Sequence, residues 1–419
     1  MKQPAGFFFG MALCLLIAID SYAQNPSDSL RTVDSKALKI FLDCERCDDD
    51  YIRTEIAFVN YVRDRKEAQV HLLITTQETG SGGTEFTLTF IGQLNQAGMS
   101  DTLKFNSRQT STPDEIRQGL VRVIKMGLLR YVAKTPQAEQ ISITYKKPAE
   151  TKVVGDKWNY WVFGINLDSF LNGEKSTSFI SLYGSLTANR VTPAWKINLS
   201  LSGHYNESNF DLGDRTISSL SRGKSFRSLM VKSLGEHWSA GFSGTVFSST
   251  FSNTELGLNG APAVEYNLYK YAESTRRQLR FLYEIGYNFY RYDEETIYDK
   301  ISENLLNQEL AITLDVKQPW GSVETSLEGS TYFHDLDKNR VELFSELSLR
   351  LFKGVSLRVF GQVARIRDQL SLPKGGAAPE EILLQRRQLE TQYSYFASIG
   401  LSYTFGSIYN NVVNPRFGN

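Results

Sequence analysis

The chain lacks the long apolar runs that membrane-spanning helices need. Across its 419 residues the mean hydropathy is −0.30, and the only continuous apolar run lies at the N-terminus. A helix needs about 20 apolar residues to cross a bilayer, so a bundle of membrane helices is excluded. Membrane-spanning strands are not excluded, because half of their side chains are polar and averaged hydropathy hides them.

The chain also lacks an excess of charge of either sign. Its 46 basic and 46 acidic residues cancel. A nucleic-acid binder normally carries a clear basic excess to neutralise phosphates. Nucleic acid is therefore not an expected partner.

The N-terminus has the features of an export signal. Lys2 precedes an apolar core at residues 7–19, and Ser21-Tyr22-Ala23 supplies a small-x-small cleavage site. We predict a secretory signal peptide over residues 1–23, with the mature chain starting at Gln24. An uncleaved anchor is the alternative, but the apolar run is short for a span.

Cysteine is scarce, and Cys44 and Cys47 are the only cysteines after the predicted signal. Their C-x-x-C spacing permits a redox pair, but the acids at residues 48–50 would raise a thiol pKa. Zinc ranks third, since two ligands are too few and His71 is the only nearby histidine. A structural disulfide in an oxidising compartment is the favoured interpretation. We expect no metal site and no cofactor.

Residues 37–147 predict a small α+β domain of order β-α-β-β-β-α. Asp48 is expected to cap a helix whose apolar stripe runs from Ile52 to Val62, and Thr112 to Glu115 form a capping box for a second helix. Gly80 to Gly83 lack the Gly-Lys-Ser/Thr ending of a nucleotide loop and predict a hairpin turn. The predicted strands are residues 38–42, 69–76, 85–91 and 102–106, with 141–145 as a candidate edge strand.

The last of the long alternating segments, Gln392 to Phe405, shows the pattern of the C-terminal half. Tyr393, Ile399 and Tyr403 fall on one face with other apolar residues, while small polar residues fall on the other. Aromatics lie at both ends of the apolar face. The segment is longer than the 5 to 6 residues usual for strands of soluble proteins, and its aromatic ends are typical of a strand that crosses a bilayer.

We count twelve such segments after Trp158. They predict a 12-stranded antiparallel transmembrane β-barrel over residues 157–406. Tight turns near Pro193, Gly235, Pro319 and Gly354 alternate with longer loops at residues 207–221, 293–304 and 370–387. Short periplasmic turns and long outer loops are the expected asymmetry, so the small domain is expected in the periplasm.

Some of these segments resemble a known group of proteins. The signal that ends in Tyr22-Ala23-Gln24, the run from Phe41 to Glu55 and the run from Val59 to Asp64 are similar to Gram-negative (Bacteroidota-like) outer-membrane barrel proteins with a short N-terminal periplasmic domain. The resemblance covers most of the chain. It implies compartment and architecture, with outer-membrane lipid and the barrel-assembly machinery as partners, and it brings no catalytic residues.

The alternation also predicts a charged wall facing the barrel lumen. Carboxylates outnumber bases in this wall, which favours a narrow, water-filled passage for cations or small polar solutes; a closed, solvated lumen is nearly as well supported. The predicted wall comprises Glu284, Glu309, Asp315, Glu324, Glu328, Glu342, Glu346, Arg350 and Arg358, with Lys317 nearby.

Two other classes of function compete with passage. An outer-membrane hydrolase would need a histidine near a serine or an acid, and among the four histidines only His334, with Asp335 and Asp337, suggests such an arrangement. We therefore expect no enzyme and no catalytic residues. A structural or assembly barrel, whose small domain docks a periplasmic partner, is the other alternative and is not separated from passage by the sequence.

Overall fold

The computed structural model describes residues 36–80, 82–144, 156–375, 388–407 and 409. The predicted signal peptide, residues 1–23, lies outside the described residues. The described part is mainly β: a five-stranded sheet with helices near the N-terminus and a twelve-stranded antiparallel sheet after it. No helix among these residues is long and apolar enough to cross a membrane.

The small N-terminal domain has a mixed sheet of order β2-β1-β3-β4-β5. Strand β1 runs parallel to both β2 and β3, and the remaining pairs are antiparallel. Its strands are β1 Lys39–Cys44, β2 Asn60–Tyr61, β3 Val70–Glu78, β4 Thr84–Gly92 and β5 Ser100–Asn106. Its helices are α1 Asp49–Glu55 and α2 Pro113–Val132, with the short 3-10 helices η1 Arg65–Glu67, η2 Leu94–Gln96 and η3 Pro136–Gln140.

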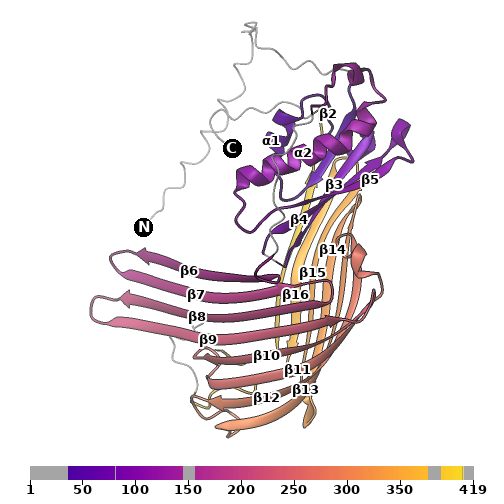
Figure 1. Ribbon diagram of the computed structural model, residues 1–419. Coiled ribbons are helices and arrows are strands. Elements are labelled where there is room, and N and C mark those ends of the chain that lie inside the picture. Colours follow the sequence, from indigo (N-terminus) through magenta and orange to yellow (C-terminus); the bar gives the residue numbers. More distant parts are fainter. Residues whose placement is uncertain (1–35, 81, 145–155, 376–387, 408, 410–419) are drawn as a thin grey trace, which may run out of the picture.

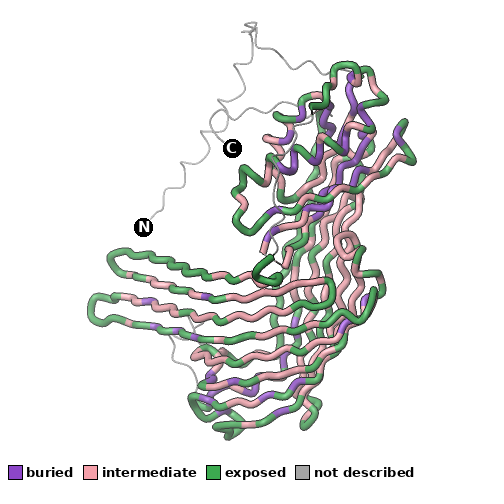
Figure 2. The backbone as a smooth tube through the Cα atoms, in the orientation of Figure 1, coloured by how far each residue is buried: buried purple, intermediate pink, exposed green. Residues whose placement is uncertain are grey.

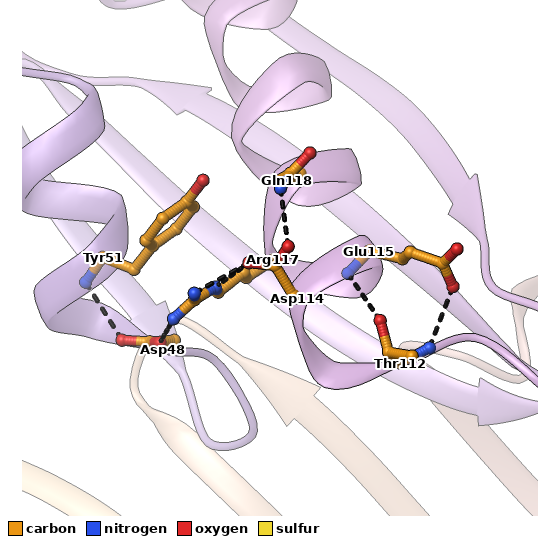
Figure 3. Close-up of polar contacts among 7 residues, drawn as sticks. All are labelled: Asp48, Tyr51, Thr112, Asp114, Glu115, Arg117 and Gln118. Atoms are coloured by element: carbon orange, nitrogen blue, oxygen red, sulfur yellow. Dashed lines mark hydrogen bonds and ion pairs between the residues drawn. The ribbon is translucent and has the colours of Figure 1, made fainter.

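Both helices begin where the sequence predicts. The Asp48 side chain accepts a hydrogen bond from the Tyr51 amide at 3.0 Å, and Thr112 and Glu115 form the reciprocal capping box. Arg117 bonds to Asp48 at 3.2 Å, which joins the start of α2 to the start of α1 (Figure 3). The two caps therefore also position the helices relative to each other.

The sequence prediction of the first helix was wrong in its length. The helix ends at Glu55, and the residues that continued its apolar stripe belong to the short strand β2 and its flanks. Here Asn60 N–H donates to Leu38 and Val62 N–H donates to Ile40, so pairing with β1 outcompetes further helical hydrogen bonds. The candidate edge strand is also wrong over residues 141–144, which form no strand, and residue 145 lies outside the described part.

The core of the small domain is buried and continuous. Ile40, Leu72, Leu88, Ile124 and Leu128 are each 0% exposed and belong to one buried cluster. In Figure 2 the buried residues gather in this domain, whereas the large sheet is half-buried or exposed over most of its length. The N-terminal domain thus has the core of a soluble domain, and the large sheet does not.

The large sheet contains the twelve strands that the alternation predicts. Each strand pairs antiparallel with its neighbour in the chain, from β6 to β17. The strands are β6 Trp161–Gly173, β7 Thr177–Val191, β8 Trp195–Asp211, β9 Thr216–Ser233, β10 Trp238–Ser249, β11 Thr254–Asn267, β12 Arg277–Tyr292, β13 Ser302–Gln318, β14 Gly321–Tyr332, β15 Asp335–Phe352, β16 Val355–Ile366 and β17 Tyr393–Tyr403.

The two outer strands of this sheet, β6 and β17, are not paired with each other in the structure. Every residue of β17 is exposed. Figure 1 shows β6 to β9 running crosswise to β14 to β16, so the sheet coils strongly, as accumulated strand twist produces. Closure into a barrel therefore stays a prediction.

The predicted contrast between short and long connections is weaker than the sequence indicated. Residues 207–221 are not a loop, because β8 and β9 stay paired up to Asp211 and Thr216.

The large sheet has two ends, which we name by their connections. The near end has connections 192–194, 234–237, 268–276, 319–320 and 353–354. The far end has connections 174–176, 212–215, 250–253, 293–301, 333–334 and 367–392.

Candidate functional site

The strand register assigns each side chain of the large sheet to one of two faces. Directly paired residues of an antiparallel sheet point to the same side, so the pairs can be followed from strand to strand. Glu284 pairs with Glu309, Ala311 with Glu328 and Glu328 with Glu342. We call the face that carries these residues the polar face.

All the predicted wall residues lie on the polar face by this register. Asp315 pairs with Glu324, Glu324 with Glu346, and Ser348 with Arg358; Arg350 is two positions beyond Ser348 on the same side of β15. The register thus brings together, on one face, charges from strands β12 to β16. Whether this face lines a lumen depends on closure of the sheet.

The opposite face, which we call the apolar face, is exposed. Its side chains include Ile165 at 74% exposure, Leu167 at 84%, Ile399 at 74% and Leu401 at 71%. Soluble monomers rarely expose apolar surface of this extent, which is typical of contact with lipid or another protein. Aromatic residues add to it at the strand ends, as with Tyr393 and Tyr403 on β17.

Like charges stand directly opposite each other across the polar face. The register pairs Glu284 with Glu309, Glu328 with Glu342, and Glu324 with both Asp315 and Glu346. Such cross-strand pairs are destabilising on their own. Among the described residues, the ion pairs of these acids on the sheet are Lys317 to Asp315 at 3.5 Å and Arg340 to Glu342 at 3.7 Å.

Beside the acids, a row of amides crosses three strands. Asn259 on β11 bonds to Asn288 on β12, and Asn288 bonds to Asn307 on β13 at 2.7 Å. The Ser243 hydroxyl donates to Glu284 at 3.4 Å. These side chains line a cavity of about 130 Å³ that Glu309 also borders. These amides, hydroxyls and carboxylates therefore give this part of the polar face a hydrogen-bonding surface.

At the far end, a segment of the last long connection folds back over the polar face. Leu370 and Leu372 are 7% and 5% exposed. Arg340 on the polar face bonds to Asp368 at 3.1 Å, and Asn253 donates to the Ser371 carbonyl at 3.0 Å. The sequence predicted a long outer loop over residues 370–387, and residues 376–387 lie outside the described part.

At the near end, the small domain lies against the sheet (Figure 1). Arg350 of β15 binds the Asp43 carboxylate of β1 through both terminal nitrogens, at 2.7 Å and 2.5 Å. Arg350 is thus a contact between the small domain and the polar face, a role that no sequence pattern indicated. The sequence indicated only that Arg350 lies beside a predicted turn.

Further contacts extend along the near end. Lys353 Nζ lies 2.6 Å from Glu67, and Arg63 donates to the Phe405 carbonyl at 3.1 Å. On the other side, Gly80 approaches β7 so closely that an added Cβ would lie 2.1 Å from Val191 Cβ. The small domain therefore contacts β7, near one edge of the open sheet, and the chain just beyond β17, at the other edge.

The four histidines are dispersed. His71 is 0% exposed and its Nε2 lies 2.8 Å from Asp43; His237 Nδ1 lies 2.8 Å from the Asn267 carbonyl. His204 faces Tyr183 across the polar face. His334 contacts the Tyr332 ring, and in the described part of the chain no ion pair joins it to Asp335 or Asp337.

Cys44 and Cys47 form a disulfide in the structure, with 5.7 Å between their Cα atoms. It lies in the bend between β1 and α1. Within the described ranges, no group of three or more histidine, cysteine or acidic side chains is arranged to hold a metal ion.

Comparisons with known proteins add little. No family model matches the chain, and no curated protein matches it. Among solved structures, the NanC porin in a rhombohedral crystal form is similar with 7% identity and a TM-score of 0.27, over 58% of this chain and 100% of that chain. A TM-score at this level supports no conclusion about function, which must come from the chain's own residues.

Proposed function

We propose that the chain is an outer-membrane β-barrel protein that passes or binds small polar solutes, with a preference for cations. The difference between the two faces of the large sheet supports the proposal. One face is apolar and exposed; the other carries the carboxylates, amides and serines, together with a cluster of Phe344, Phe360 and Phe396. A sheet with lipid on one side and water on the other satisfies both faces.

The proposal includes closure of the sheet through β6 and β17. An edge strand offers unpaired amides and carbonyls, which cannot face the hydrocarbon of a bilayer unsatisfied. Both edges carry the same alternation, with Ile165 and Leu167 on the apolar face of β6 and Ile399 and Leu401 on that of β17. Pairing them antiparallel keeps both faces continuous around the barrel.

The cation preference follows from the opposed carboxylates. Glu284, Glu309 and Glu328 lie close together on the polar face by register, and no ion pair offsets them among the described residues. A bound or passing cation would relieve this repulsion, whereas an anion would add to it. The amide row beside them suits hydroxyl or amide groups of an uncharged polar solute.

Compartment and partners follow from the same arrangement. We place the small domain in the periplasm, because it lies at the near end, where most connections are tight turns. The partners of the whole protein are then outer-membrane lipid and the barrel-assembly machinery. A scaffold barrel whose small domain docks a periplasmic protein is the alternative, but the Asp43 side of that domain is occupied by the chain's own Arg350.

Single-channel recording in planar bilayers tests the function. We expect a small, cation-preferring conductance for the purified protein, and a weaker cation preference in Glu309→Gln and Glu328→Gln. Ser330→Ala, next to them on the polar face and without charge, is the matched control and should behave as wild type. The absence of conductance at any voltage would overturn passage in favour of a scaffold barrel.

A further inference from the structure

The contact between Asp43 and Arg350 differs from the other contacts at the near end in its burial. The Asp43 side chain is 11% exposed and that of Arg350 is 34% exposed. In the Lys353–Glu67 pair the corresponding values are 59% and 37%. Exposed pairs contribute little, while loss of one partner of a buried pair is costly. Asp43–Arg350 is therefore the dominant polar attachment of the small domain.

Contacts within the small domain fix the position of the Asp43 carboxylate. His71 of the neighbouring strand β3 is fully buried and its Nε2 lies 2.8 Å from the same carboxylate. The Phe41 ring contacts both residues that bind the Asp43 carboxylate. Its centroid is 5.1 Å from that of His71 and 5.3 Å from the Arg350 guanidinium carbon. Arg350 also donates to the Pro319 carbonyl at 3.1 Å. Both halves of the contact are thus pre-positioned by their own domains.

This contact stands over the polar face at its near end. A cleft of about 260 Å³ remains between the two domains. Its lining from the small domain includes Arg46 and Thr75, and its lining from the sheet includes Asp315, Glu324 and Ser348. The cleft thus lies where the small domain meets the near end of the polar face.

We propose that the small domain is a cover over the near end of the polar face and that the Asp43–Arg350 ion pair is its latch. The inference rests on the proposed passage and adds its regulation: loss of the latch widens access to the acids of the wall. Acids outnumber bases in the lining of the cleft, so the same cleft also selects for cations.

The test is the labelling rate of a cysteine placed at Ser348, inside the cleft, by a membrane-impermeant maleimide in proteoliposomes. The natural Cys44–Cys47 disulfide does not react with maleimide. Labelling should be about tenfold faster when Arg350→Gln or Asp43→Asn is added, because a half-buried ion pair between the small domain and the sheet is lost. The double variant should gain no more than either single variant, since both remove the same contact.

Two of the variants separate loss of the latch from misfolding of the small domain and from a general loss of charge at the near end. Arg350→Gln leaves the small domain's own sequence intact, including His71 beside Asp43. Lys353→Gln removes an exposed pair at the same end and should leave the labelling rate within about twofold of the parent.

The labelling rate tests the latch, and the conductance tests the passage, so the two proposals can be rejected independently. Equal labelling rates in all variants would overturn the latch, whatever the conductance shows. Faster labelling in the latch variants without any conductance would keep the latch and overturn the passage. Larger conductance in Arg350→Gln than in wild type, together with faster labelling, is the result expected if both hold.

Discussion

The two sheets of this chain differ in what lies against their apolar side chains. In the small domain, Ile40, Leu72 and Leu88 turn inward and are fully buried beneath helices. In the large sheet, Ile165, Ile399 and their neighbours turn outward and are exposed. The alternation of polar and apolar residues therefore predicts a strand. It does not predict whether the apolar face of that strand is buried or exposed, because this depends on what covers the face.

The largest expected effect is the loss of stability when a buried apolar residue of the small domain is truncated, compared with an exposed apolar residue of the large sheet. Ile124→Ala on α2 removes a side chain that is 0% exposed and should cost about 2–5 kcal/mol, measured by hydrogen exchange of β3 and β4 in the full-length protein. Ile399→Ala, at a site that is 74% exposed, is the control and should leave that exchange unchanged. Equal losses would contradict the contrast.

A second test places one charge on either face of the same strand. In liposomes, Leu310→Arg puts an arginine on the apolar face of β13 and should destabilise the sheet by about 2–4 kcal/mol. Ala311→Arg puts it on the polar face, directly opposite Glu328, where it gains an ion-pair partner. Urea unfolding of the two reconstituted variants compares them, and a larger loss for Ala311→Arg would reverse the assignment of faces.

The strands were more predictable than their surroundings. Twelve long strands and both helix caps were predicted from alternation and capping residues, which are local signals. The alternation was less clear for β9, whose first residues were predicted as part of a loop. The end of α1 was not predictable, because Val59 and Val62 continue a helical stripe while the backbone around them pairs with β1. The Asp43–Arg350 contact links residues far apart in sequence, and no local pattern reports it.

The third prediction concerns the disulfide, which belongs to the small domain alone. Replacing Cys44 and Cys47 by serine should lower the stability of that domain by about 2 kcal/mol, the value expected for a short loop, with no effect on insertion of the large sheet. Hydrogen exchange of α1 and β1 measures the first effect. A readily reversible disulfide with an oxidising potential would instead favour the redox alternative.

The smallest expected effect is the pH dependence of docking. Burial raises the pKa of the Asp43 carboxyl, but hydrogen bonds from His71 and Arg350 more than offset it and leave the pKa below its usual value. A lowered carboxyl pKa stabilises docking at neutral pH, and this stabilisation is lost as the pH falls below about 3.9 and through the lowered value.

Electron–electron distance measurements can follow this loss. With spin labels at Arg122→Cys on α2 and Thr216→Cys on β9, the distance distribution should be narrow at neutral pH and broaden in acid. Adding Asp43→Asn should make it broad at every pH. A narrow distribution in that variant would show that other contacts hold the small domain.

The most direct test of the central claim is a cysteine scan of β13 in proteoliposomes, one residue at a time over residues 309–313. We predict that Glu309→Cys, Ala311→Cys and Thr313→Cys react with a water-soluble maleimide, and that Leu310→Cys and Ile312→Cys react only with a lipid-soluble one. Uniform labelling along the strand, or the opposite alternation, would contradict a sheet with lipid on one face and a water-filled polar face on the other.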